Sequence, residues 1–181
     1  LFAQQQGKIW RLGYIDFGSR QSTVDAGRHD ALMQGLRELG YVEGKNFVLE
    51  ARYAGGNTDR LDEFAAEMVR QKADVILTLG SGASRAAQRT TATIPIVIIS
   101  SPDPVGEGFA ASLARPGGNI TVMSNGADDT VQKLVELLIA VIPKLNRIAL
   151  LTNPANGAHP SLLSSVQAAA RKTGKQVLPM N

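Results

Sequence analysis

The sequence predicts an α/β protein built on a doubly wound parallel sheet, and three observations support that fold class. Segments with strand periodicity alternate with segments of helix periodicity along the whole 181-residue chain. Residues 74–79 and 96–99 are almost continuously apolar, which is typical of parallel strands buried on both faces. The chain is 44% hydrophobic and only 5% aromatic, with 18 glycines and 8 prolines that supply frequent turns. Strands joined by helices pair in parallel through right-handed crossovers.

The first 53 residues are predicted to form a strand, a helix and a second strand. Residues 9–16 are a short strand-like stretch that ends in the turn 17–19. Apolar residues in 24–39 recur with helical spacing, and Gly40 ends that helix. Residues 47–53 are rich in β-branched and aromatic side chains, so a strand is expected there.

The next segments repeat this order of strand and helix. Thr58 is expected to cap a helix over 61–72 whose apolar residues share one face. The buried strand 74–79 follows, then an Ala-rich helix over 81–91 and the buried strand 96–99. Later elements are predicted at 107–114 (a short helix), 119–123 (strand), 131–142 (helix), 147–152 (strand), 162–171 (helix) and 176–178 (strand).

These elements divide into one complete lobe and part of another. Five strands precede Met123, so residues 8–122 are predicted to form a first α/β lobe. Residues 123–181 supply the crossing between lobes and an incomplete second α/β lobe. That lobe has too few elements to cover both faces of a sheet, so self-association through it is a further expectation. Residues 1–7 are expected to be a disordered terminus or a signal-peptide remnant.

Composition excludes several classes of function. The net charge is only +3 and no run of Lys or Arg occurs, which argues against a nucleic-acid partner. No apolar run reaches eighteen residues, so a membrane span is not expected. With no cysteine and two histidines, the sequence predicts no metal site. His29 and His159 lie far apart in the sequence and no acid–base pair stands out, so neither catalytic residues nor an enzyme are predicted.

A small-ligand site is expected where the parallel strands end, because turn-to-helix segments gather at that edge of the sheet. Backbone N–H groups of residues 80–84, at the start of a helix, favour a carboxylate or phosphate, although the same residues also suit simple helix capping. A partial Gly-x-Gly match here does not follow the first strand, so no nucleotide cofactor is predicted. The candidate ligand-binding residues are Phe17, Gly18, Ser19, Gly80, Ser81, Gly82, Ala83, Ser84, Ser101, Asp103 and Asn125.

Two candidates outside the helix start have both a binding and a structural interpretation. Asp103 lies between two prolines after a buried strand and suits an ammonium or hydroxyl group, or else shapes its own turn. Phe17 suits the flat face of a ligand, or else packs under its loop. The hypothesis is that residues 80–84 bind a ligand carboxylate, Asp103 its ammonium and Phe17 its ring.

Five segments of the chain resemble ABC-transporter substrate-binding proteins of the tryptophan/tyrosine-binding type. They are residues 34–46, 94–97, 103–106, 112–121 and 153–156. The resemblance implies a type I periplasmic-binding-protein fold, in which two Rossmann-like lobes close on a small ligand such as an aromatic amino acid. It also implies an ABC transporter permease as partner and a periplasmic location, secreted or membrane-tethered.

The sequence departs from this family at three places near the expected site. Ser81 stands where Thr is frequent, Gly82 where Pro is frequent and Pro102 where Gly is frequent. These departures leave the ligand open, with branched amino acids as further candidates. The family's second lobe continues beyond Asn181, so the chain is expected to hold only the beginning of that lobe. A ligand-sensing regulatory domain of the same fold is the alternative function.

Overall fold

The structure is a computed structural model that describes residues 7–154, 156 and 159–180, and of residues 127–129 it describes the backbone alone. The predicted terminal segment 1–7 therefore lies, except for Gly7, outside the described residues. The elements follow one another as β1 (Trp10–Asp16), α1 (Arg20–Asp25), α2 (Arg28–Glu38), β2 (Phe47–Tyr53), η1 (Thr58–Arg60), α3 (Leu61–Arg70), β3 (Val75–Leu79), α4 (Ser81–Thr90), β4 (Ile96–Ser101), β5 (Ile120–Ser124), α5 (Ala127–Val141), β6 (Arg147–Leu151), α6 (His159–Arg171) and β7 (Gln176–Met180).

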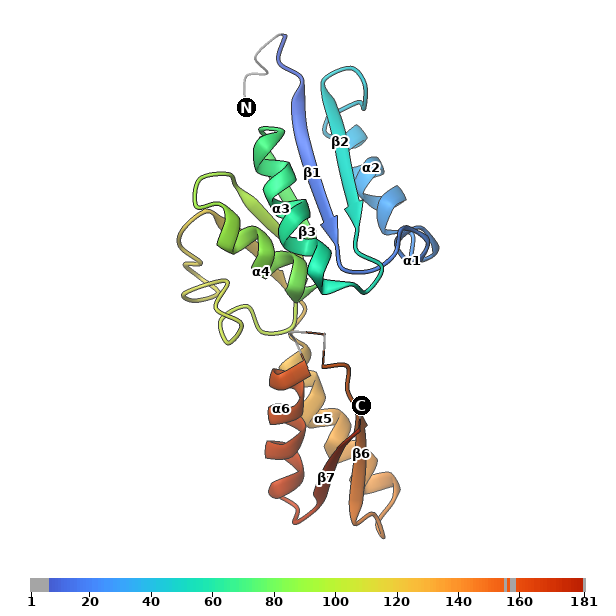
Figure 1. Ribbon diagram of the computed structural model, residues 1–181. Coiled ribbons are helices and arrows are strands. Elements are labelled where there is room, and N and C mark those ends of the chain that lie inside the picture. The colour runs from blue at the N-terminus through green and yellow to red at the C-terminus, as the bar shows by residue number, and fades with distance from the viewer. Residues whose placement is uncertain (1–6, 155, 157–158, 181) are drawn as a thin grey trace. The chain divides into compact units, whose positions relative to one another are not determined.

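The described strands form a five-stranded sheet and a separate two-stranded sheet. The larger sheet has the order β2-β1-β3-β4-β5, and the pairs β1/β2, β1/β3 and β3/β4 are parallel. Strands β6 and β7 pair in parallel in the smaller sheet. Each parallel connection passes through a helix (Figure 1), so the predicted α/β class is confirmed.

Successive side chains of β1 point to opposite faces of the larger sheet, and their contacts show which helix covers each face. Leu12 and Tyr14 are buried in a cluster that includes Leu36 of α2, so α2 covers that face. Gly13 faces the opposite way, because a Cβ at this position would lie 2.7 Å from the Sδ atom of Met68 in α3. Helices therefore cover both faces, as a doubly wound sheet requires (Figure 1).

Three local predictions are wrong. The helix expected over 24–39 is two helices, α1 and α2, because Gly27 between them takes a left-handed conformation with φ of +67°. Asn57, not Thr58, is the capping residue: its side chain accepts the Asp59 backbone N–H at 2.9 Å and caps η1, the short helix that leads into α3. Residues 107–114 are not a helix: the single turn there ends at Gly108, whose φ is +74°.

The chain divides into two compact units. Unit 1 is Leu1–Ile99 with Gly118–Thr121, and unit 2 is Ser100–Gly117 with Val122–Asn181. The loop 100–117, which the sequence places in the first lobe, thus groups with unit 2. In unit 2, helices α5 and α6 pack together over one face of the two-stranded sheet, around a buried cluster of Val135, Ile148, Val166, Ala169 and Ala170.

Candidate ligand-binding site

The loop that follows β1 is held by backbone hydrogen bonds to the last residue of β3 and to the loop after β2. The Phe17 N–H donates to the Leu79 carbonyl at 3.0 Å, and the Gly55 N–H donates to the Gly18 carbonyl at 2.9 Å. The Gly18 N–H also donates to Asp16 Oδ1 at 2.7 Å. Residues 17 and 18 are therefore fixed before any ligand arrives, which reduces the entropy that binding must overcome.

The Asp16 carboxylate organises this loop from beneath. Asp16 is only 3% exposed. Its Oδ2 accepts hydrogen bonds from the hydroxyls of Thr23 in α1 and Tyr14 in β1. Burial, together with the nearby Asp16 charge, raises the pKa of Tyr14 well above its usual value, so Tyr14 keeps its proton and stays a donor. Asp16 is thus a positioning residue under the predicted site.

Of the three predicted residues after β1, Ser19 has a clear structural task. Its side-chain oxygen accepts the Ser22 N–H at 3.1 Å and caps α1. Ser22 in turn donates its hydroxyl to the Ser19 carbonyl at 2.8 Å. The backbone of Ser19 is therefore well ordered, while its hydroxyl is occupied in capping the helix.

The start of α4 has the features predicted for an anion site. Gly80 has a φ of +92°, and a Cβ there would lie 3.0 Å from the Phe17 Cβ, so both the turn and the close approach of Phe17 require glycine. The N-cap residue is Gly80, which has no side chain to cap the helix, and the first turn of α4 holds no acidic residue. The N–H groups of Ser81, Gly82 and Ala83 therefore stand at the positive end of the α4 dipole.

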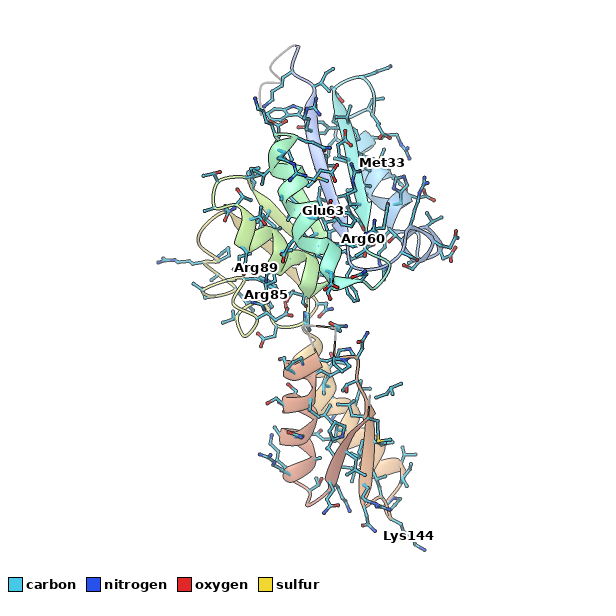
Figure 2. The ribbon with its side chains drawn as sticks, viewed as in Figure 1. Met33, Arg60, Glu63, Arg85, Arg89 and Lys144 are labelled. Carbon is cyan, nitrogen blue, oxygen red and sulfur yellow. The ribbon has the colours of Figure 1, made fainter. Side chains whose placement is uncertain are left out.

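Two other predicted residues of this segment lie in the core. Ser84 is fully buried, with its hydroxyl 2.9 Å from that of Thr78 and 3.1 Å from the Gly80 carbonyl, to which it donates. Ala83 is also fully buried. Their side chains support the α4 start from below. The basic side chains of α4, Arg85 and Arg89, lie beyond its first turn (Figure 2).

In unit 2, Asp103 forms a tight turn at the end of β4. Its Oδ1 accepts the Gly106 N–H at 2.8 Å, and its backbone carbonyl accepts the Glu107 N–H at 2.9 Å. A Cβ at Gly106 would lie 1.9 Å from Asp103 Oδ2, so only glycine leaves room for this carboxylate. Oδ1 is thus used in the turn, and Oδ2 has no partner among the described residues.

Ser101 and Asn125 belong to the same part of unit 2. The Ser101 hydroxyl donates to the buried Glu107 carboxylate, and the Ser101 carbonyl accepts the Asn125 N–H at 3.1 Å. The Asn125 side-chain amide donates to the Ser100 hydroxyl at 3.1 Å. Hydrogen bonds therefore bring Ser101 and Asn125 together although they are far apart in the sequence.

The structure groups the predicted residues within each unit. In unit 1 the loop 17–18 and the start of α4 lie together, and in unit 2 Ser101 meets Asn125. Sequence reasoning missed the supporting roles of two buried carboxylates, Asp16 and Glu107. An acidic residue at the last position of a buried strand is a usable signal for Asp16. Nothing in the local pattern marks Glu107, which was expected at a helix start.

Neither metal nor membrane features are found in the part of the chain that the structure describes. No group of three or more His, Asp or Glu side chains there is arranged to hold a metal ion. Within the same residues, no helix has the length and hydropathy needed to cross a bilayer. His159 begins α6, where its Nδ1 accepts the Asn153 N–H at 2.6 Å.

Loops at the carboxyl ends of parallel strands, beside a helix start, are the usual place where α/β lobes bind small molecules. Residues 22–181 match the family described as ABC transporter substrate binding protein. The chain therefore belongs to this family, and the resemblance seen in the sequence is confirmed.

A curated relative and two solved structures show the same similarity. The chain is 27% identical over 146 residues to a tyrosine-binding protein of Clostridioides difficile, a match that covers 81% of this chain and 42% of the relative. A conserved domain protein from Vibrio cholerae superposes with a TM-score of 0.83 at 28% identity, over 96% of this chain and 57% of that one. An ABC domain from Streptococcus pneumonia in complex with L-Trp superposes with a TM-score of 0.82 at 22% identity, over 96% of this chain and 57% of that one.

These similarities confirm the predicted fold of a type I periplasmic-binding-protein lobe. They also show that the chain spans less than half the length of the curated relative and just over half of each solved structure.

Proposed function

We propose that this chain is part of an extracytoplasmic receptor that binds a small ligand, such as an aromatic or branched amino acid, for an ABC importer. The family match over residues 22–181 carries this proposal. One similar protein is a tyrosine-binding protein and another is in complex with L-Trp, so aromatic amino acids are the first class to test. The predicted permease partner and a periplasmic location, secreted or membrane-tethered, belong to the same proposal.

The ligand carboxylate is proposed to bind at the start of α4. Three features support this: the N-cap residue is a glycine without a side chain, the first turn lacks an acidic residue, and Gly80 leaves room for Phe17 beside the helix start. Backbone N–H groups at a helix start favour an anion by their direction and by the helix dipole. Phe17, fixed beside Gly80, is proposed to contact the apolar part of the ligand.

Analogues of tyrosine test the carboxylate contact directly. In the full-length protein, we expect tyrosine or tryptophan to raise the melting temperature, because both would bind only the folded state. Tyramine, which lacks the carboxylate, is expected to give no shift. An equal shift with tyramine would exclude the α4 start as the carboxylate site, and turnover of the bound amino acid would show an enzyme instead of a receptor.

Within unit 2, Asp103 is proposed to accept a hydrogen bond from an ammonium group. Its Oδ1 is used in the turn, but Oδ2 has no partner among the described residues. The variant Asp103→Asn removes the charge yet keeps an Oδ1 acceptor for the Gly106 N–H. We expect it to weaken amino-acid binding by about 1.5–3 kcal/mol, measured by calorimetry.

Two controls distinguish ligand binding by Asp103 from its structural role in the turn. Asp30→Asn removes the same charge from an exposed site in α2 and is expected to leave affinity unchanged. Hydroxyphenylpropionate, which lacks the ammonium, should bind wild type and Asp103→Asn equally well. If Asp103→Asn binds tyrosine as wild type does, Asp103 has only its structural task.

A further inference from the structure

A cavity of about 340 Å³ lies at the end of the strands of unit 1 opposite to the candidate site. Its lining includes Trp10, Phe47 and Val75, which are the first residues of β1, β2 and β3. Since these strands are parallel, the cavity is at their amino ends, whereas the 17–18 loop and the α4 start follow their carboxyl ends. The cavity is therefore a separate place from the proposed amino-acid site.

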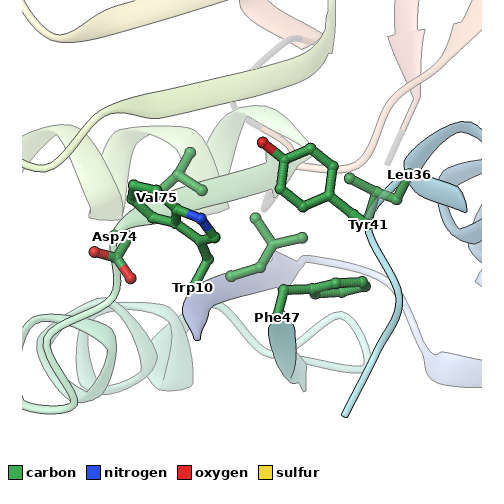
Figure 3. A pocket seen from close by; sticks show the side chains of 7 residues that line it. Trp10, Leu36, Tyr41, Phe47, Asp74 and Val75 are labelled. Carbon is green, nitrogen blue, oxygen red and sulfur yellow. The ribbon is translucent and has the colours of Figure 1, made fainter. Parts of the chain in front are cut away.

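The walls of this cavity are mostly apolar and aromatic. Leu12 and Phe47, 7% and 3% exposed, form its buried part, and Leu36 of α2 adds another aliphatic wall. Trp10 and Tyr41 contribute two further rings (Figure 3). A volume in this range, lined by rings, suits a ligand with one or two rings of its own.

Two polar atoms face this apolar space. Figure 3 shows the indole nitrogen of Trp10 and the hydroxyl of Tyr41 both directed toward the space between these two side chains. Neither atom has a hydrogen-bond partner among the described residues. An indole N–H only donates, and a phenol hydroxyl donates readily, so the cavity favours a ligand that carries an acceptor such as a carbonyl oxygen.

The single charged group of the lining, Asp74, is neutralised by its neighbours. Its Oδ1 pairs with Lys8 Nζ at 2.6 Å, and its Oδ2 accepts the Arg11 N–H at 2.8 Å. The Lys8 ammonium also lies 3.8 Å from the centre of the Trp10 ring. Because the carboxylate and ammonium cancel, the cavity offers no net charge, and an ionic ligand would lose its hydration without gaining a partner.

We propose that this cavity is a second binding site, specific for a small uncharged aromatic molecule with a hydrogen-bond acceptor. Its rings contact the ligand's ring, and the Trp10 N–H and Tyr41 hydroxyl donate to the acceptor. This site is independent of the proposed amino-acid site, because no lining residue belongs to the 17–19 or 80–84 segments.

Trp10, which lines the cavity, is a natural fluorescent probe for this site. It is the only tryptophan of the chain, so tryptophan fluorescence reports on the cavity alone. In the purified chain, we expect benzamide to change Trp10 emission along a saturable curve. Benzoate, the same ring with an anionic group, is expected to bind about tenfold more weakly or not at all. Cyclohexanecarboxamide, which keeps the amide but lacks the aromatic ring, should also bind several-fold more weakly.

A pair of matched variants tests the hydrogen bond. Tyr41→Phe removes only the hydroxyl and should weaken benzamide binding about fivefold, as the loss of one hydrogen bond predicts. Tyr53→Phe makes the same change at the far end of β2 and should leave benzamide binding unaltered. Circular dichroism on both variants confirms that the fold is kept.

Three results would overturn the proposal. These are a benzamide titration without saturation, equal binding of benzoate and benzamide, and an equal loss in Tyr41→Phe and Tyr53→Phe. None of these outcomes affects the proposed amino-acid site, which the tyramine comparison tests separately.

Discussion

At the scale of single residues, the buried Asp16 carboxylate connects β1, α1 and the 17–19 loop. It accepts hydrogen bonds from Gly18, Thr23 and Tyr14 while only 3% exposed. We expect Asp16→Ala to lower the free energy of unfolding by about 2–4 kcal/mol, because several buried donors lose their charged acceptor together. Urea denaturation measures this loss.

The control for this prediction is Asp25→Ala. Asp25 ends α1 and is exposed, with a side-chain bond to Gln21 at 2.7 Å. Its replacement should cost less than about 0.5 kcal/mol. Equal losses in the two variants would mean that Asp16 does not organise the loop.

The sequence predicts where the candidate residues lie, but not which partner each side chain contacts. The segments after β1, β3 and β4 were correctly expected at strand ends, since strand periodicity fixes those ends. Which hydroxyl points inward was not predictable. Ser84 bonds to Thr78, and Ser101 bonds to Glu107, and each choice depends on tertiary packing rather than on local pattern. The binding roles of the candidate residues remain predictions.

At the scale of elements, two glycines of the α1–α2 region should respond in opposite ways to the same substitution. Gly27 separates the helices with a φ of +67°, which an alanine adopts only with strain. Gly35 lies inside α2, and a Cβ there meets no atom within 4 Å. We expect Gly27→Ala to destabilise the chain by about 1 kcal/mol and Gly35→Ala to stabilise it by up to about 1 kcal/mol. Thermal unfolding followed by circular dichroism distinguishes the two signs, and a gain from Gly27→Ala would contradict the helix break.

The apolar spacing in 24–39 predicted one helix because periodicity alone does not register a single left-handed residue. The spacing is interrupted for only two residues, Ala26 and Gly27, before α2 begins. The error at 107–114 has the same origin, since Gly108 ends the turn there. Positive φ at glycine depends on where the chain must go next, and that is a tertiary property.

Strand β2 at the sheet edge is tied to α3 by one ion pair. Arg52 donates from Nε to Glu67 Oε2 at 2.9 Å and from Nη2 to Oε1 at 2.6 Å. The hydrogen bond from Arg52 lowers the pKa of Glu67 from its usual value. A lowered folded-state pKa stabilises the fold above the unfolded pKa of about 4.3, and this contribution disappears as the pH falls through the folded pKa.

The variant Glu67→Gln should therefore reduce stability at pH 7 and show a shallower loss of stability in acid than wild type does. Unfolding midpoints in urea at several pH values measure both effects. As a control, Glu63→Gln changes an exposed carboxylate of the same helix (Figure 2) and should leave the acid profile unchanged. Parallel acid profiles for wild type and Glu67→Gln would rule out this linkage.

At the scale of the whole molecule, alternating periodicity was sufficient for the fold class but not for the arrangement. Helical crossovers require parallel strands, so the parallel pairing followed from the pattern. The strand order β2-β1-β3-β4-β5 could not be predicted from the pattern, because it depends on which strand each crossover returns to. Likewise, loop 100–117 groups with unit 2 through contacts that no local pattern encodes.

In unit 2, helix α5 is apolar on two sides. Val131, Val135 and Ile139 pack against the unit's core. On another side Leu134, Leu137 and Val141 are 58%, 51% and 78% exposed. Exposed apolar patches of this kind favour association, since contact removes their area from water. We therefore expect this chain to self-associate at micromolar concentration, as measured by sedimentation velocity.

Substitutions on that side of α5 test whether its exposed apolar side chains mediate the association. Leu137→Gln combined with Val141→Gln should shift the chain toward monomer, because both side chains lose apolar area that association would bury. Leu39→Gln alters a single exposed leucine at the end of α2, 74% exposed, and should leave the association unchanged. The self-association hypothesis fails if wild type sediments as a monomer throughout. If Leu39→Gln has the same effect as the double variant, the association does not run through α5.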